Sequence, residues 1–153
     1  MPDKQLLFIC TGNICRSPMA EYLLRDRLGP DTDWEVRSVG VAGMPGLPAS
    51  APAVEVMRER GIDISEHQSR AVSRESVDWA TLLVVMTEGH RRQMASQYPD
   101  ATGKLFVLKS FAAAGGGDLE DPIGAPVETY RKVRDEIDDV LPELVEFMRQ
   151  VDV

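Results

Sequence analysis

The residues best placed to do chemistry lie close together near the start of the chain. Residues 10–18 read Cys-Thr-Gly-Asn-Ile-Cys-Arg-Ser-Pro, with the thiol of Cys10 first, the guanidinium of Arg16 six residues later and the hydroxyl of Ser17 after that. Residues 6–9 directly before this segment are all apolar. The pattern predicts a strand that ends at a nucleophilic thiol, followed by a loop that opens a helix.

A loop of this kind can bind an oxyanion. Backbone N–H groups that turn inward, next to a helix N-terminus, offer many donors and a favourable dipole. Arg16 adds a planar fork that can hold two oxygens. The same donors favour a negatively charged sulfur at Cys10. We expect Gly12 to supply an unusual backbone conformation, and Ser17 to cap the helix with Pro18 at its first position.

Two further interpretations concern the support of the thiol. Ser17 can donate its hydroxyl to the Cys10 sulfur, and Asn13 can hold the loop through side-chain bonds to backbone. The alternative is a buried structural cysteine beside a capped helix, as is usual for a lone cysteine. The fixed spacing of cysteine, arginine and serine between a strand and a helix favours the catalytic interpretation.

Other ligand classes fit the loop poorly. Cys10 and Cys15 together supply only two of the four ligands that zinc requires, so we expect no metal. A nucleotide-binding P-loop is excluded because the segment lacks the Gly-Lys-Ser/Thr ending.

Size and composition limit the classes of protein further. The chain has 153 residues, which suits one core, so we expect a single domain over residues 1–153. No apolar run approaches the roughly 20 residues of a membrane span, and the run before Cys10 is too short for a signal peptide. We expect a cytoplasmic protein with no membrane partner.

The charge balance bears on the partners. The chain carries 25 acidic and 17 basic residues, for a net charge of −8. This disfavours a nucleic-acid partner, which needs a basic surface, and it also opposes long-range steering of an anionic ligand. Anion binding must therefore be local. We expect a monomer or weak dimer.

Apolar strands alternate with amphipathic helices along the chain. Strands are predicted over residues 5–10, 34–39, 81–86 and 104–108. Helices are predicted over residues 19–28, 51–60, 88–98 and 127–148, with a helical turn over 73–78 and loops over 41–50 and 111–125. Pro142 should kink the last helix or break its first bonds.

This alternation predicts an α/β fold in three layers, with a four-stranded parallel sheet covered by helices on both faces. In such sheets sites form at the carboxyl ends of the strands, near the switch in strand order. Cys10 lies at such an end.

The loop and several later segments resemble one known family. Residues 10–21, Cys-Thr-Gly-Asn-Ile-Cys-Arg-Ser-Pro-Met-Ala-Glu, are similar to the signature of the low-molecular-weight protein tyrosine phosphatases. Ser38-Val-Gly40, the segment 61–65 with His67 and Arg70, and Asp121-Pro122 match later parts of the family pattern. The resemblance covers nearly the whole chain and implies a flavodoxin-like arrangement.

The resemblance implies a mechanism without a cofactor, acting on a phosphorylated protein. Cys10 would attack phosphorus in line and form a cysteinyl-phosphate, and Asp121 would protonate the leaving group and then activate water. Asp118 and Glu120 are nearby competitors for the role of acid. Phosphate would be held by the loop residues Thr11, Gly12, Asn13, Ile14, Cys15, Arg16 and Ser17.

Three matched residues would support the loop from below. Asn13, Ser38 and His67 correspond to positions that form a hydrogen-bond network in the family. The alternative for His67 is an exposed loop histidine. His90 has no match, and we expect it on the surface of a helix.

The chain also departs from the family pattern. Ile123 stands where an aromatic residue usually follows Asp-Pro, and the loop over 41–50 offers only Met44 and Leu47 as a pocket wall. We expect an aliphatic pocket with weaker ring stacking. Much of the chain resembles the bacterial branch that contains protein arginine phosphatases, whereas Ile14, where that branch has threonine, matches tyrosine-specific members. Because Ile14 should touch the substrate, it favours phosphotyrosine.

Other functions remain as alternatives. Oxidation could join Cys10 to Cys15 and protect Cys10 from irreversible oxidation; Cys15 could equally be a small packing residue. Arsenate reductases of similar fold need further resolving cysteines, and this chain has none. A phosphoresidue-binding module without activity would have no use for Cys10, Arg16 and Asp121 together.

Overall fold

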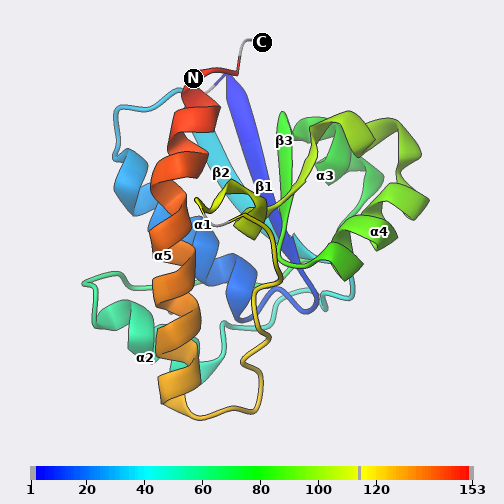
Figure 1. The fold of residues 1–153 in the computed structure, drawn as a ribbon. Coiled ribbons are helices and arrows are strands. Elements are labelled where there is room, and N and C mark those ends of the chain that lie inside the picture. The colour runs from blue at the N-terminus through cyan, green and yellow to red at the C-terminus, as the bar shows by residue number, and fades with distance from the viewer. Residues whose placement is uncertain (1–2, 114, 152–153) are drawn as a thin grey trace.

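Parallel strands and covering helices alternate throughout the computed structural model, which describes residues 3–113 and 115–151 (Figure 1). The strands are β1 Lys4–Cys10, β2 Trp34–Gly40, β3 Leu82–Val85 and β4 Leu105–Val107. The helices are α1 Arg16–Leu28, α2 Ala51–Arg58, α3 Arg74–Trp79, α4 Glu88–Gln97 and α5 Val127–Arg149, with 3₁₀ helices η1 Pro99–Lys104 and η2 Leu108–Phe111.

The strands form one sheet in the order β2-β1-β3-β4, and every pairing is parallel. The chain first moves outward from β1 to β2 and then crosses to β3 on the other side of β1. Strand order therefore switches at β1, which is where ligand sites form in open parallel sheets. β1 runs downward in Figure 1, so its carboxyl end lies at the lower edge of the sheet. Cys10 is the last residue of β1.

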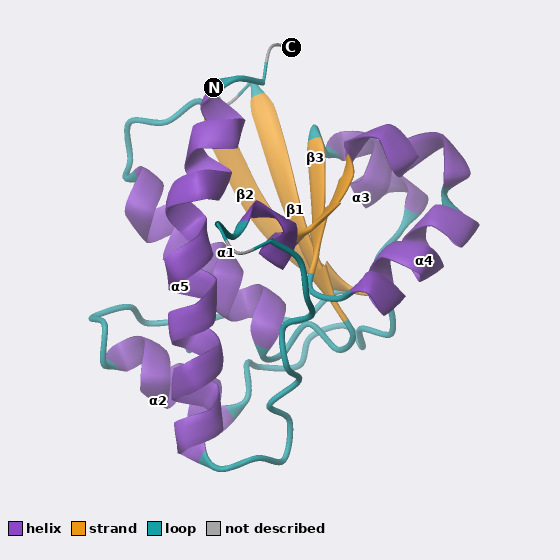
Figure 2. Cartoon of the chain, in the orientation of Figure 1, coloured by secondary structure: helices purple, strands orange, loops and turns teal. Residues whose placement is uncertain are grey.

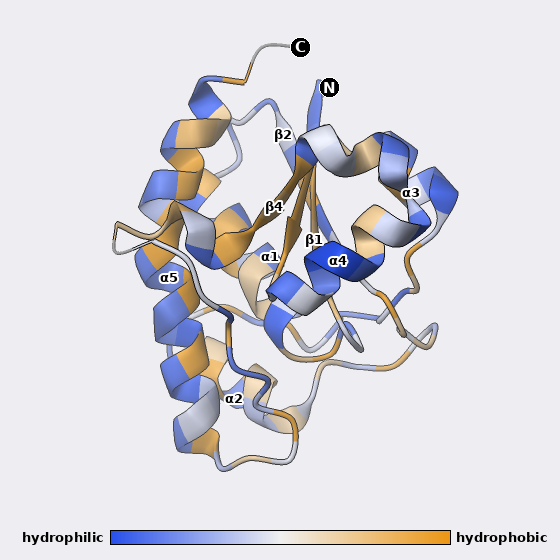
Figure 3. Ribbon diagram, turned by 45° about the vertical axis from the view of Figure 1, so that its right-hand side comes forward, coloured by the Kyte–Doolittle hydropathy of each residue, from blue (hydrophilic) through white to orange (hydrophobic). Residues whose placement is uncertain are grey.

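Both faces of the sheet are covered, which confirms the predicted three-layer fold (Figure 2). On one face, Leu6 and Phe8 of β1 pack with buried residues of α1, α2 and α5. On the other, Leu7 and Ile9 pack with residues of α3 and α4. Burial on both sides explains why residues 6–9 are all apolar rather than alternating. Figure 3 shows hydrophobic strands between helices with hydrophilic outer surfaces.

Most predicted elements are confirmed, with shifts at their ends. α1 begins at Arg16, three residues before the predicted start, and Cys15 occupies its N-cap position without a side-chain cap. The prediction that Ser17 caps this helix is therefore wrong. η1 and η2 were not predicted, and α5 continues through Pro142 to Arg149, so this proline does not end the helix. The predicted domain over residues 1–153 includes residues 1–2 and 152–153, which lie outside the described residues. The same holds for residue 114 in the predicted loop over 111–125.

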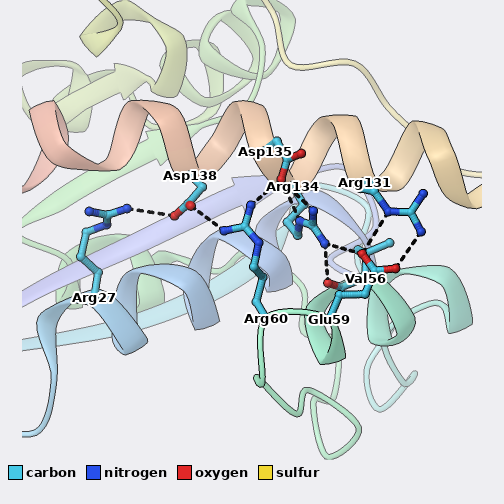
Figure 4. A network of polar contacts seen from close by, with 8 residues as sticks. All are labelled: Arg27, Val56, Glu59, Arg60, Arg131, Arg134, Asp135 and Asp138. Carbon is cyan, nitrogen blue, oxygen red and sulfur yellow. Dashed lines mark hydrogen bonds and ion pairs between the residues drawn. The ribbon is translucent and has the colours of Figure 1, made fainter.

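An ion-pair network joins α5 to α1 and to the end of α2 (Figure 4). Glu59 accepts from both Arg131 and Arg134, and Arg134 is buried and also donates to the Val56 carbonyl. Arg27 and Arg60 both donate to Asp138, and Arg60 also donates to Asp135. The network therefore holds α5 against α1, which begins directly after Cys15, and against the residues that follow α2.

This network predicts acid sensitivity. Hydrogen bonds from Arg131 and then Arg134 lower the pKa of Glu59 from 4.5 to about 2. Because the folded-state pKa is depressed, the stabilisation is fully present above the unfolded pKa of 4.5 and is lost as pH falls toward 2. We expect the free energy of unfolding, measured by urea titration between these values, to decline less steeply in Glu59→Gln than in the wild type. Glu143→Gln, at an exposed position of α5, is the control; equal slopes in all three proteins would contradict the prediction.

Candidate active site

The thiol of Cys10 lies at the end of β1, where the loop to α1 begins. It is 3% exposed, and its Sγ accepts the Asn13 backbone N–H at 3.3 Å and lies 2.8 Å from Ser17 Oγ. Both contacts place hydrogen-bond donors around the sulfur.

Asn13 organises the loop from beneath. It is the only non-glycine residue with positive φ in the described part of the chain, at 59°. Its Nδ2 donates to Ser17 Oγ and to Ser38 Oγ, both at 2.8 Å, while its Oδ1 accepts the Arg70 N–H at 3.0 Å. The prediction that Gly12 supplies the unusual conformation is therefore wrong, since the left-handed residue is Asn13, whose short polar side chain tolerates it.

The side-chain amide of Asn13 fixes the direction of the hydrogen bonds made by Ser17 and Ser38. Ser38 donates to Glu21 Oε1 at 2.5 Å, so it accepts from Asn13. Ser17 likewise accepts from Asn13, which leaves its own hydroxyl hydrogen free to point at the Cys10 sulfur. A directed chain thus runs from the base of the loop to the thiol.

His67 and Glu21 hold this series of hydrogen bonds in place. His67 is buried and its Nε2 donates to the Asn13 carbonyl at 2.8 Å, so it is not the exposed histidine of the alternative interpretation. Glu21 is buried and pairs with Arg25. Burial raises the pKa of Glu21, although Arg25 and the Ser38 hydroxyl oppose the rise. Sequence reasoning missed Glu21, whose partner Ser38 is 17 residues away.

The loop also requires a close approach from β2. A Cβ on Gly40 would lie 2.5 Å from the Thr11 carbonyl oxygen, closer than real Cβ contacts. Gly40 is therefore the residue that lets the end of β2 lie against the loop.

Arg16 links the loop to the segment before α5. Its guanidinium is buried and donates from Nη1 to the Leu119 carbonyl at 2.9 Å and from Nη2 to Thr11 Oγ1 at 3.4 Å. Nη2 also lies 3.5 Å from Asp121 Oδ2. One cation therefore contacts both the loop of the thiol and the segment that carries the carboxylates.

The three competing carboxylates are placed differently. Asp118 Oδ1 accepts the Glu88 N–H at the start of α4, and Glu120 lies 3.9 Å from Lys132. Asp121 lies beside Arg16 and lines the same cavity as Cys10. Of the three, Asp121 is the one that faces the thiol.

The cavity at the thiol has a volume of about 160 Å³. It is lined by Cys10, Thr11, Gly12, Ile14, Cys15 and Arg16 from the loop, and by Asp121 and Ile123 from the segment before α5. Asn13 and Ser17, which are fully buried, are not among the residues that line it. Met44 and Leu47 are not among the lining residues. Both are exposed, Met44 at 65% and Leu47 at 43%, as is Ile123 at 55%. The predicted aliphatic wall is thus formed by the two isoleucines at the cavity.

Cys15 lies in a buried polar contact with α5. Its Sγ is 3.3 Å from Ser50 Oγ and 3.4 Å from the Tyr130 hydroxyl. Burial raises the pKa of the Cys15 thiol and raises that of Tyr130 to about 12. At neutral pH this sulfur is a neutral thiol, and it holds the end of the loop in place.

His90 is a functional candidate that sequence reasoning missed. It is 7% exposed rather than on the surface, and its Nε2 lies 2.9 Å from Thr11 Oγ1. Burial, and then the charge of Arg16, lower its pKa to about 4. The available signal was the position of Thr87, which caps α4 directly after β3, the neighbour of β1.

The described residues contain neither a membrane-spanning helix nor a metal-binding cluster. None of the helices in residues 3–113 and 115–151 has the length and apolar character to cross a membrane. In the same residues, no group of three or more histidine, cysteine, aspartate or glutamate side chains could hold a metal ion.

A strand, a thiol-containing anion loop, an arginine and a facing carboxylate define the class of cysteine-dependent phosphatases. Residues 5–152 match the family model described as low molecular weight phosphotyrosine protein phosphatase, and the chain belongs to this family.

Relatives named for two different substrates have similar sequence identity to this chain. A protein-arginine-phosphatase of Geobacillus stearothermophilus is 42% identical, covering 95% of this chain and 96% of its own. A probable low molecular weight protein-tyrosine-phosphatase, EpsP, of Ralstonia solanacearum is 39% identical, covering 90% of this chain and 86% of its own.

Solved structures show the same division. The YwlE arginine phosphatase from Geobacillus stearothermophilus superposes with a TM-score of 0.88 at 41% identity, covering 95% of this chain and 93% of its own. The low molecular weight protein tyrosine phosphatase from T. tengcongensis gives 0.89 at 42% identity, covering 94% and 99%. Overall similarity therefore does not separate the two substrate classes.

Proposed function

We propose that this phosphatase hydrolyses phosphotyrosine in proteins through a cysteinyl-phosphate at Cys10. The observation that carries the substrate class is the cavity wall, where Ile14 and Ile123 present apolar surface beside the thiol. An aryl ring gains from contact with such surface.

The geometry supports a reaction in two steps. In the first, the Cys10 sulfur attacks phosphorus and forms an S–P bond while the bond to the tyrosine oxygen breaks. Asp121 supplies the proton that this oxygen gains. Arg16 and the loop N–H groups hold the phosphoryl oxygens as charge shifts onto them.

In the second step, water replaces the sulfur. Asp121, now a carboxylate, accepts a proton from the water as its oxygen bonds to phosphorus and the S–P bond breaks. The Ser17 hydroxyl, 2.8 Å from Sγ and already accepting from Asn13, stabilises the departing thiolate. Inorganic phosphate and the free Cys10 thiolate result, and Asp121 is again protonated.

A protein arginine phosphatase is the second candidate. Two relatives named protein-arginine-phosphatase, at 42% and 36% identity, support it. The cavity argues against it, because a phosphoarginine guanidinium carries N–H donors that would face Ile14 and Ile123 rather than polar acceptors. Among the described residues that line the cavity, Asp121 is the one carboxylate, and the mechanism requires it as acid.

The substrate experiment is a comparison of matched peptides. One peptide sequence carrying phosphotyrosine or phosphoarginine at the same position is offered to the reduced wild-type protein, and kcat/KM is measured from phosphate release. Faster turnover of the phosphotyrosine peptide supports the proposal. Faster turnover of the phosphoarginine peptide would overturn it in favour of the second candidate.

Replacement of Ile14 tests the residue that carries the proposal. We expect Ile14→Thr to shift the ratio of the two kcat/KM values toward phosphoarginine by roughly tenfold, because one hydrogen bond to a charged donor replaces an apolar contact. Ile14→Val keeps an apolar wall and is the matched control. An unchanged ratio in Ile14→Thr would show that this position does not determine preference.

A further inference from the structure

The contact between His90 and Thr11 connects α4 to the loop of the thiol. His90 belongs to the first turn of α4, where its backbone N–H caps onto Thr87 Oγ1. Its ring is buried, and Nε2 lies 2.9 Å from Thr11 Oγ1. Thr11 is exposed and lines the cavity. The ring is therefore placed to control one hydroxyl at the phosphate site without touching the substrate.

The Thr11 hydroxyl has a limited set of roles. It has one hydrogen and two lone pairs. Arg16 Nη2 lies 3.4 Å away and can only donate, so the hydroxyl accepts that bond. The remaining question is whether the hydroxyl hydrogen goes to His90 or is free to point into the cavity.

The surroundings of Nδ1, the other ring nitrogen of His90, indicate which tautomer is present. Nδ1 is buried and has no hydrogen-bond partner among the residues that the structure describes. If Nδ1 carried the proton, a buried N–H donor would lack an acceptor, an arrangement that is rarer than an unpaired acceptor. A proton on Nε2 leaves a bare lone pair at Nδ1 and places an N–H opposite Thr11.

The tautomer of His90 decides whether the Thr11 hydroxyl attracts or repels an anionic ligand. With Nε2–H donating, Thr11 accepts from both His90 and Arg16, and its hydroxyl hydrogen is free to point into the cavity. With the opposite tautomer the hydroxyl hydrogen is bound to Nε2 and one lone pair accepts from Arg16, so Thr11 presents only its second lone pair to a phosphoryl oxygen, which it repels.

We propose that His90 is a positioning residue that donates Nε2–H to Thr11 and thereby makes the Thr11 hydroxyl a donor to a phosphoryl oxygen of the substrate. Burial and the neighbouring Arg16 keep the imidazole neutral, as its lowered pKa indicates. This role rests on the proposed phosphatase activity, but the tautomer that it requires is a property of the free protein.

The first test is the tautomer of the wild-type protein. Long-range ¹H–¹⁵N NMR of the histidine rings near pH 7 distinguishes a protonated Nε2 from a protonated Nδ1. We expect Nε2–H for His90. A protonated Nδ1 would overturn the proposal whether or not the protein hydrolyses phosphate esters, so this result is independent of the proposed function.

The second test is a double-mutant cycle read out by kinetics on an aryl phosphate and by inhibition with inorganic phosphate. Thr11→Val removes the donor, and we expect KM and the phosphate inhibition constant to rise about tenfold with a smaller change in kcat. His90→Leu leaves the hydroxyl without orientation and should raise both roughly threefold. In the double variant the His90 replacement should add nothing.

Rescue separates positioning from mere packing. His90→Gln can place an amide N–H near the position of Nε2, and we expect it to stay within about twofold of the wild type. Multiplicative effects in the double variant, or His90→Leu kinetics equal to the wild type, would overturn the proposal. If His90→Leu does not fold, the NMR result and His90→Gln still decide it. Failure of the wild type itself to turn over aryl phosphate would instead overturn the proposed function.

Discussion

Replacing Cys10 with serine should abolish turnover of aryl phosphates while leaving the protein folded and able to bind phosphate. Cys10 supplies the cavity-lining thiol at the end of β1, whereas the Cys15 thiol contacts Ser50 and Tyr130. A hydroxyl in place of the Cys10 thiol has no base to activate it: its neighbours Asn13 N–H and Ser17 Oγ stabilise an anion rather than accept a proton. Loss of a nucleophile that acts through a covalent intermediate costs about 10⁴-fold or more in kcat.

The measurement pairs kinetics with binding. Steady-state release of nitrophenol is followed for the wild type and Cys10→Ser under reducing conditions, and inorganic phosphate binding is measured by calorimetry. We expect phosphate affinity to remain within an order of magnitude, because Arg16 and the loop N–H groups are unchanged. Residual turnover of more than a few per cent would contradict the role of Cys10, and absence of turnover in the wild type would favour a binding module.

A chemical trap gives the corresponding positive result. Rapid quenching of the wild type during turnover of ³²P-labelled substrate should leave label on the protein, and peptide mapping should place it on the peptide that contains Cys10. Because Cys15 lies on the same peptide, Cys15→Ser is labelled in parallel. Label that persists in Cys15→Ser and disappears in Cys10→Ser assigns the phosphate to Cys10.

Local patterns were sufficient to predict the sheet and the position of the thiol. The apolar residues 6–9, the loop and the following helix are adjacent in sequence, so spacing alone places Cys10 at the end of β1. Strand order then fixes which loops meet there, since β3 lies next to β1. The end of each helix was less predictable: α1 starts at Arg16 because the loop geometry, and not a serine cap, sets its first turn.

The contacts that could not be predicted join residues far apart in sequence. His90 reaches Thr11 across 79 residues, and Arg16 reaches the Leu119 carbonyl across 103. Neither partner differs in type from an ordinary surface histidine or an ordinary carbonyl, so residue type does not mark them, and for His90 only its place just after β3 was a signal. Asn13 is a different case: glycine is the usual residue at positive φ, and only the three bonds of the Asn13 side chain show why asparagine takes that role here.

Asp121→Asn should slow turnover in a way that depends on the leaving group. A general acid contributes about 10²- to 10⁴-fold when the departing oxygen needs a proton. We expect a loss in that range for phenyl phosphate, whose phenoxide leaves poorly, and a much smaller loss for a dinitrophenyl phosphate, whose phenoxide leaves without help. The plot of log kcat/KM against leaving-group acidity should therefore become steeper in the variant.

The control for this prediction is Glu120→Gln, which removes a neighbouring carboxylate that lies near Lys132 and does not line the cavity. Its slope should match that of the wild type. Asp121 also lies 3.5 Å from Arg16 Nη2, so Asp121→Asn frees the guanidinium from a competing anion and should bind inorganic phosphate no more weakly than the wild type. Equal slowing of all leaving groups, together with weaker phosphate binding, would mean that Asp121 positions Arg16 and that the acid lies elsewhere.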